Sequence, residues 1–172
     1  MPLQLGSLAP SFEAKAYFCA SDEVKTVALS DFAGKWLCLF FYPLDFSSLC
    51  PTETTGFNAR INEFQKRDCE IIGCSCDSTY SHKAWCKATK GMESLGYPLL
   101  SDMTKRISMD YGVLLPERGI SLRGTFLIDP EGKLRWMAVY DLPIGRSLDE
   151  ILRVIDALKT GEACALDWQP GS

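Results

Sequence analysis

The chain has 172 residues, of which 47% are hydrophobic and 23% charged, as is typical of one globular domain and not of a disordered chain. Its formal net charge is -4, and no run of lysine and arginine is interleaved with aromatic residues, which argues against nucleic acid as a partner. The longest apolar run covers residues 36–42, far short of the roughly 20 residues that span a bilayer, and residues 1–12 lack the pattern of a signal peptide. We therefore expect a cytoplasmic protein with no membrane partner.

The first strong structural signal is the apolar run at residues 36–42, which predicts a central strand buried on both faces. A loop follows, and residues 50–64 predict a helix because Pro51 suits a first helical turn and apolar residues recur at helical spacing. Cys50 is thus expected where the loop gives way to the helix. Residues 69–76 predict a second strand, and residues 81–90 a short helix.

The second half of the chain continues the alternation of strands and helices. Residues 99–100 and 104–111 suggest a strand and a helix, and residues 125–140 predict an antiparallel hairpin around an Asp-Pro-Glu-Gly turn. The last helix is the best marked: Ser147 and Glu150 form a capping-box pattern, and Gly161 supplies the stop.

This order of elements predicts an α/β fold with a mixed central sheet and helices on both faces. The sequence shows no internal repeat and no interdomain linker. We therefore assign residues 1–161 to one domain and residues 162–172 to a C-terminal segment without regular structure.

Cys50 is the leading candidate for chemistry. A thiolate is the reactive form of cysteine, and the free N–H groups and the dipole at a helix N-terminus stabilise it. Ser47 and Ser48 add hydroxyl donors, and Pro43 and Pro51 stiffen the loop. From these residues alone, a reactive thiol and a buried structural cysteine remain open alternatives.

The other cysteines and the single histidine have plainer interpretations. Cys74 and Cys76 could hold zinc or form a redox pair, but in a strand they point to one face, and the chain has no CxxC motif, so we favour packing. Cys19, Cys38, Cys69 and Cys86 are interpreted in the same way, as reduced thiols of a cytoplasmic protein. A cysteine hydrolase would need His82 as its base, whereas its place near a helix start favours a surface or packing role.

Residues 40–53 resemble the peroxiredoxins, specifically the typical two-cysteine, alkyl hydroperoxide reductase C-type group. The similarity continues through residues 77–85, 110–113, 119–129, 141–147 and 161–164, and so covers nearly the whole chain. The resemblance implies a thioredoxin-like fold and a thiol-dependent peroxidase that reduces hydrogen peroxide and organic hydroperoxides without metal, flavin or haem.

The same resemblance implies roles for individual residues. Cys50 corresponds to the peroxidatic cysteine, in a signature formed here by Pro43, Ser47 and Cys50, with serine in place of the commoner threonine. Arg123 corresponds to the arginine that approaches the reactive sulfur, and Glu53 and Arg146 to a supporting ion-pair network. Cys164 corresponds to the resolving cysteine, which attacks the sulfenic acid on Cys50 of the partner subunit. The partners implied are a thioredoxin-like or other dithiol reductase and a second copy of the chain, in a homodimer or a ring of five dimers.

Two departures from the family pattern bear on the mechanism. Residues 163–168 lack the usual valine-cysteine-proline, so a one-cysteine peroxidase, in which Cys164 does not resolve Cys50, remains an alternative. A redox-regulated chaperone on the same scaffold is a further alternative. Residues 91–96 do not reproduce the family's GGLG insertion, and no C-terminal helix follows Cys164. We therefore expect disulfide formation to be faster than overoxidation of Cys50.

Overall fold

In the computed structural model, which describes residues 2–172, the predicted central strand is β3 (Trp36–Phe41), and all six of its residues are buried. It pairs in parallel with β4 (Cys69–Ser75) and antiparallel with β8 (Arg123–Ile128). Successive side chains point to opposite faces, so that Phe40 belongs to one hydrophobic core and Phe41 to another. A strand buried on both faces needs an apolar side chain at nearly every position, which is why the run carries no alternation.

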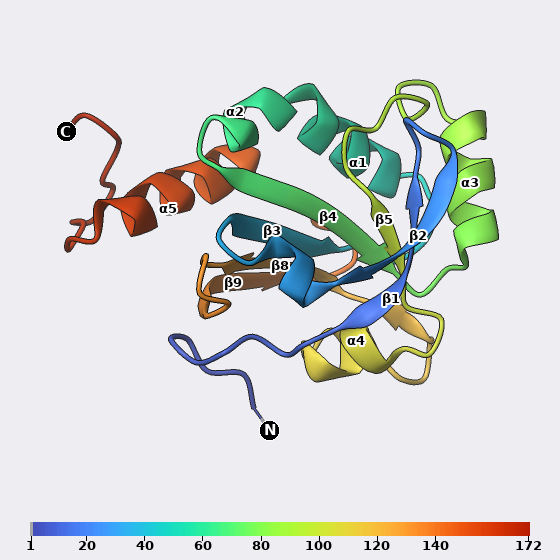
Figure 1. The fold of residues 1–172 in the computed structure, drawn as a ribbon, viewed down its shortest axis with the longest axis horizontal. Helices are drawn as coiled ribbons and strands as arrows, with labels where there is room; N and C mark the ends of the chain where they lie inside the picture. Colours follow the sequence, from blue (N-terminus) through green and yellow to red (C-terminus); the bar gives the residue numbers. More distant parts are fainter. Residues whose placement is uncertain (1) are drawn as a thin grey trace.

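Seven strands form the main sheet in the order β2-β1-β5-β4-β3-β8-β9, in which β1 is Glu13–Phe18 and β2 is Glu23–Ala28. A small hairpin of β6 (Leu114–Leu115) and β7 (Ile120–Ser121) lies apart from it (Figure 1). β5 (Leu99–Ser101) pairs in parallel with β4, and β9 (Leu134–Tyr140) completes the predicted antiparallel hairpin with β8. The mixed sheet confirms the predicted fold class.

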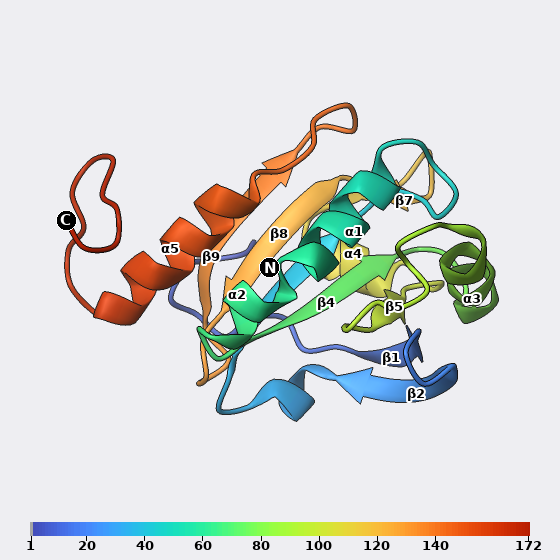
Figure 2. The same cartoon turned by 90° about the horizontal axis from the view of Figure 1, so that it is seen from above.

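Helices cover both faces of this sheet, as predicted. α1 (Cys50–Ala59), α2 (Ile61–Gln65) and α5 (Leu148–Thr160) lie on one face, and α4 (Arg106–Asp110) lies on the other (Figures 1 and 2). α3 (Thr79–Ala88) contributes Trp85 and Cys86 to the core on the α1 side.

Three details differ from the predictions. The hairpin of β1 (Glu13–Phe18) and β2 (Glu23–Ala28) and the short 3₁₀ helix at Leu29–Phe32 had no clear sequence signal, because most side chains of β2 are exposed and no apolar alternation marks the strand. The predicted helix over residues 50–64 is broken at Arg60, whose φ of -110° and ψ of 16° are not helical. β8 begins two residues before the predicted start, and this places Arg123 inside the sheet.

α5 begins and ends where the sequence predicts. The Ser147 hydroxyl accepts a hydrogen bond from the Glu150 N–H at 3.3 Å, and Gly161 ends the helix with a φ of 69°. Only half of the expected capping box forms, because the Glu150 carboxylate pairs with Arg153 instead of returning to the helix start. Residues 162–172 contain turns but no helix or strand. Within residues 2–172, no helix is long and apolar enough to cross a membrane.

The cap of α5 gives a test of the fold. Replacing Ser147 with alanine leaves the Glu150 N–H without its side-chain acceptor, and we expect the free energy of unfolding to fall by about 1 kcal/mol. Urea unfolding followed by circular dichroism measures this change. Ser94→Ala, at an exposed serine outside the helices, is the matched control and should change stability by less than about 0.5 kcal/mol. Equal losses in both variants would contradict the assigned cap.

Candidate active site around Cys50

Cys50 is the first residue of α1, and its side chain is completely buried. The chain leaves β3 at Phe41, passes the buried Pro43 and reaches the helix through residues 43–49. This places the sulfur beside the first turn of α1, where backbone N–H groups lack helical partners. A negative charge on the sulfur is stabilised there by those groups and by the helix dipole.

Arg123 approaches the same sulfur from the sheet. Its Nη1 atom lies 3.3 Å from Cys50 Sγ, and its Nε donates a hydrogen bond to the Leu142 carbonyl at 2.7 Å. The residue is only 4% exposed, so water screens its charge little. A guanidinium that donates to sulfur stabilises negative charge on it, and the structure brings Arg123 into contact with the sulfur that the family resemblance paired with it.

Glu53 holds this arginine and a second one in place. Its Oε1 accepts from Arg123 Nη1 at 2.7 Å, and its Oε2 accepts from Arg146 Nε at 2.8 Å and from the Arg146 backbone N–H at 3.0 Å. Burial raises the pKa of Glu53, but the hydrogen bonds and charge of Arg146, together with the charge of Arg123, outweigh burial and hold the pKa below its ordinary value. The carboxylate is therefore ionised at neutral pH.

Arg146 has partners for its remaining donors. Nη1 donates to the Gly124 carbonyl at 2.8 Å and to Thr125 Oγ1 at 3.0 Å, and Nη2 donates to the Phe41 carbonyl. Because every N–H donor of Arg146 has an acceptor, the ion-pair network can be buried without a large desolvation penalty. The network joins α1, β8, the end of β3 and the loop before α5.

Ser47 lies beside this network, and no hydrogen bond joins Ser47 or Pro43 to the sulfur. The Ser47 hydroxyl donates to the Leu44 carbonyl at 2.9 Å, within its own loop. Ser47 and Arg123 line one open groove. Four of the predicted site residues, Cys50, Glu53, Arg123 and Arg146, are thus in direct contact, and Ser47 faces the same groove.

A buried network that the sequence analysis missed holds the loop before Cys50. Asp45 Oδ2 lies 2.8 Å from His82 Nδ1, and Tyr42 Oη donates to Asp45 Oδ1 at 2.8 Å. His82 Nε2 lies 3.1 Å from the Leu100 carbonyl. The histidine is fully buried, which contradicts a surface position and agrees with packing. Both ring nitrogens face oxygen atoms, so His82 is not placed as the base of a cysteine hydrolase.

Most other cysteines are buried thiols. Burial raises the pKa of Cys38 to about 12 and raises the pKa of Cys69, Cys74 and Cys86 above the ordinary value, so these thiols resist ionisation. Cys19 and Cys76 are only half buried, and Cys19 packs against the core on the α1 side, in agreement with the packing role predicted for it. Across residues 2–172, no three histidine, cysteine or acidic side chains are gathered as metal ligands.

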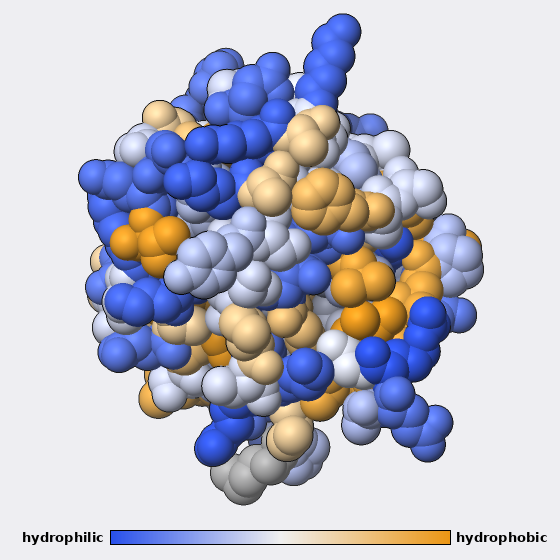
Figure 3. Space-filling model, turned by 90° about the vertical axis from the view of Figure 1, so that its right-hand side faces the viewer, coloured by the Kyte–Doolittle hydropathy of each residue, from blue (hydrophilic) through white to orange (hydrophobic). Residues whose placement is uncertain are grey.

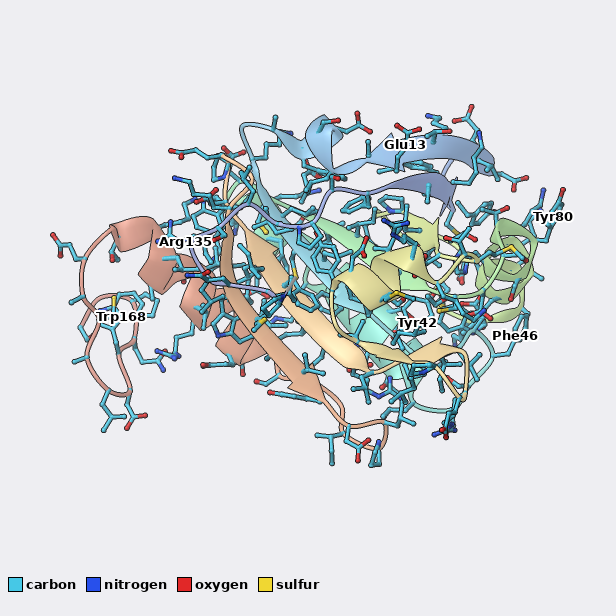
Figure 4. All side chains as sticks on the ribbon, turned by 90° about the horizontal axis from the view of Figure 1, so that it is seen from below. Glu13, Tyr42, Phe46, Tyr80, Arg135 and Trp168 are labelled. Carbon is cyan, nitrogen blue, oxygen red and sulfur yellow. The ribbon has the colours of Figure 1, made fainter. Side chains whose placement is uncertain are left out.

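Cys164 lies far from Cys50 within one protomer. The C-terminal segment extends beyond the end of α5 at one end of the molecule, whereas α1 begins over the sheet, well away from that segment (Figures 1 and 2). Figure 4 shows the same separation between Trp168 in the segment and Phe46 in the loop before Cys50. Cys164 is half buried, and its sulfur has only long contacts, including one of 3.7 Å to Thr160 Oγ1.

The chain is similar to known proteins both in sequence and in fold. The AhpC/TSA family matches residues 5–137. A thioredoxin peroxidase of Echinococcus granulosus is 48% identical over 100% of this chain and 92% of its own length, and a putative peroxiredoxin in the rubredoxin operon of Clostridium pasteurianum is 48% identical over 97% and 96%. The crystal structure of a reduced 2-Cys peroxiredoxin of Plasmodium vivax superimposes with a TM-score of 0.94 at 42% identity, covering 99% of this chain and 92% of that one.

The lowered pKa of Glu53 predicts how the network depends on pH. A carboxylate with a lowered pKa stabilises the folded state above its unfolded pKa of about 4.3, and this contribution is lost as the pH falls through the folded value. Glu53→Gln should therefore cost about 3–5 kcal/mol at neutral pH, because two buried arginines lose their counter-charge. The cost should shrink as the pH falls below about 4.

Urea unfolding of both proteins across this pH range measures the difference. Glu131→Gln is a matched control, since Glu131 forms an exposed pair with Lys133 at 3.1 Å and should contribute less than about 1 kcal/mol. A Glu53→Gln cost that does not change with pH would show that the charge of Glu53 is not what stabilises the network.

Proposed function

The chain belongs to the AhpC/TSA family and is a thiol peroxidase, and from this we propose that Cys50 is the residue that attacks the peroxide. The observation that carries this assignment is the 3.3 Å contact between Arg123 Nη1 and the Cys50 sulfur, at the N-terminus of a helix. A buried thiol beside a helix terminus and a guanidinium has the surroundings that a reactive thiolate requires.

The proposed reaction needs only the sulfur and the groups around it. The Cys50 thiolate attacks one peroxide oxygen, the S–O bond forms as the O–O bond breaks, and the other oxygen leaves with the electron pair and takes a proton to become water or an alcohol. Arg123, the backbone N–H groups of the helix start and Ser47 stabilise the charge that develops on the oxygens. Cys50 is left as a sulfenic acid, and no metal, flavin or haem takes part.

We further propose that Cys164 of the partner subunit resolves the sulfenic acid. Its thiol condenses with the Cys50 sulfenic acid, a disulfide forms, and one water molecule is released. The distance between the C-terminal segment and α1 within one protomer supports resolution between subunits (Figure 2). A thioredoxin-like or other dithiol reductase then returns both cysteines to thiols, in line with the name of the Echinococcus relative.

A homodimer, and a ring of five such dimers, is the assembly that we propose. β9 lies at the edge of the sheet with Met137 and Val139 exposed, and an edge strand is a surface that a second copy can extend. A second apolar surface includes Phe46, which is 60% exposed, and Tyr80; both point outward on one side of the molecule (Figure 4). Figure 3, seen from the side of α3, shows apolar side chains gathered between polar ones.

The compartment that we propose is the cytoplasm. All eight cysteines are free thiols in the structure, and five of them are buried. A reducing compartment keeps such thiols reduced and supplies the dithiol reductase that the cycle needs.

The role of Cys50 is tested by Cys50→Ser. A serine hydroxyl supplies almost no anionic nucleophile at neutral pH, so we expect peroxide consumption to fall by at least about 1,000-fold while the fold is kept. Stopped-flow measurement of hydrogen peroxide consumption in the presence of a dithiol reductant detects the loss. Cys38→Ser, at a buried cysteine of β3, is the control and should keep its activity if it folds. Near-normal rates in Cys50→Ser would remove Cys50 from the mechanism.

The role of Cys164 is tested by Cys164→Ser. This variant should still react once with peroxide, but it should form no covalent dimer and should lose turnover with a thioredoxin-like reductant. Non-reducing electrophoresis after one equivalent of peroxide shows the dimer directly. Cys19→Ser, at another half-buried cysteine, should still form it. A wild-type protein that consumes peroxide without forming the dimer would instead indicate a one-cysteine peroxidase.

A further inference from the structure

The open groove beside the buried thiol contains an arginine that the proposed reaction does not use. The groove has a volume of about 620 Å³ and is lined by the loop before α1, the turn between β6 and β7, and the loop after β9. Arg123, which contacts the Cys50 sulfur, is part of its wall. Another cavity that includes Arg123 has only about 10 Å³, too little for an organic peroxide. Cys50 is fully buried and does not line the groove, but its neighbour Leu49 and its contact Arg123 do, so the groove is the side on which a larger substrate comes nearest to the sulfur.

The charges deeper in the site already balance one another. Arg123 and Arg146 carry two positive charges, the Glu53 carboxylate carries one negative charge, and the thiolate form of Cys50 in the proposed reaction supplies the second. Arg123 directs its Nη1 to Glu53 and Cys50 and its Nε to the Leu142 carbonyl. This inner group has no net charge left with which to attract an anionic substrate.

Arg118 is the cation at the mouth of the groove. It lies in the turn between β6 and β7, where its backbone N–H donates to the Leu115 carbonyl at 3.1 Å. Its side chain is exposed and has no hydrogen-bond or ion-pair partner in the part of the chain that the structure describes, residues 2–172. Asp141 also lines the groove and carries a negative charge; its Oδ1 accepts the Leu142 N–H at 2.7 Å, and it forms no ion pair with Arg118. Glu117, the neighbouring acid, is not part of the lining.

We propose that Arg118 binds the carboxylate of organic hydroperoxides derived from carboxylic acids, and that this substrate class is favoured by the site. A free guanidinium offers two parallel N–H donors that match a carboxylate. Leu49, Leu142 and Pro143 line the groove and supply apolar contacts for a carbon chain. The hydroperoxide end then reaches Cys50, whose sulfur takes one oxygen, and a hydroxy acid leaves.

This inference rests on the proposed function, because it needs Cys50 as the reacting group. The test compares ω-hydroperoxyoctanoic acid with its methyl ester, which differ in charge but not in the reacting group. Stopped-flow kinetics of wild type and Arg118→Gln give the ratio of the second-order rate constants for acid and ester. We expect the wild-type ratio to be roughly fivefold higher than that of Arg118→Gln at low ionic strength, the size of one ion pair at about 4 Å in water.

Two controls separate a carboxylate site from a general effect of charge. Arg106→Gln changes the net charge equally but lies on α4, where its side chain is 78% exposed, and it should keep the wild-type ratio. Added salt should lower the wild-type ratio and leave that of Arg118→Gln unchanged, because exposed charges are screened. Equal ratios in wild type and Arg118→Gln, or an equal fall in Arg106→Gln, would overturn the inference. If wild type consumes the ester and hydrogen peroxide normally, only the role of Arg118 is lost; if it consumes neither, the proposed function is wrong as well.

Discussion

The two-sided ion pair of Glu53 is the interaction on which the rest of the site depends. One carboxylate compensates two buried guanidinium groups, Arg123 on β8 and Arg146 before α5, and it lies one helical turn after Cys50. Without it, each arginine would carry an unpaired charge into a region that excludes water, at a cost of several kcal/mol. The carboxylate thus fixes the position from which Arg123 donates to the sulfur, and it ties the first turn of α1 to the sheet.

The buried position of the Cys50 sulfur favours its attack on the peroxide but hinders its later reaction with the resolving thiol. A buried sulfur beside fixed donors suits the attack on a peroxide, since the donors need no rearrangement as charge develops. In the proposed cycle the same sulfur must then meet a thiol of another subunit, and a fully buried atom in the first helical turn cannot do so without local opening. The stability of that turn therefore governs both steps, and Glu53 belongs to the turn.

The loop before Cys50 is held from its other side by a separate buried network. Asp45 binds Tyr42 and His82, and its backbone N–H donates to Asp77 Oδ2 at 2.9 Å. These contacts join the loop to the end of β4 and to α3, so the loop enters the helix from a fixed direction. Charged and aromatic groups that take no part in the reaction thereby determine where the reactive sulfur lies.

Local patterns in the sequence determined many of the helices and strands of this protein. The apolar run of β3, the proline after Cys50 and the cap of α5 are each encoded by neighbouring residues, because burial, helix starts and helix ends depend on short-range chemistry. The hairpin of β1 and β2 was not visible there, because most side chains of β2 are exposed and because the pairing of β1 with the distant β5 places the hairpin in the sheet. The break at Arg60 had no local signal either. Resemblance to a family named Arg123, Glu53 and Arg146, but only the tertiary structure brought them together, since 70 residues separate Glu53 from Arg123 and 93 separate it from Arg146. Contacts between residues so far apart in the sequence depend on which strands are neighbours in the sheet. For the same reason the burial of His82 against Asp45 and the position of Arg118 over the groove could be learned only from the folded chain.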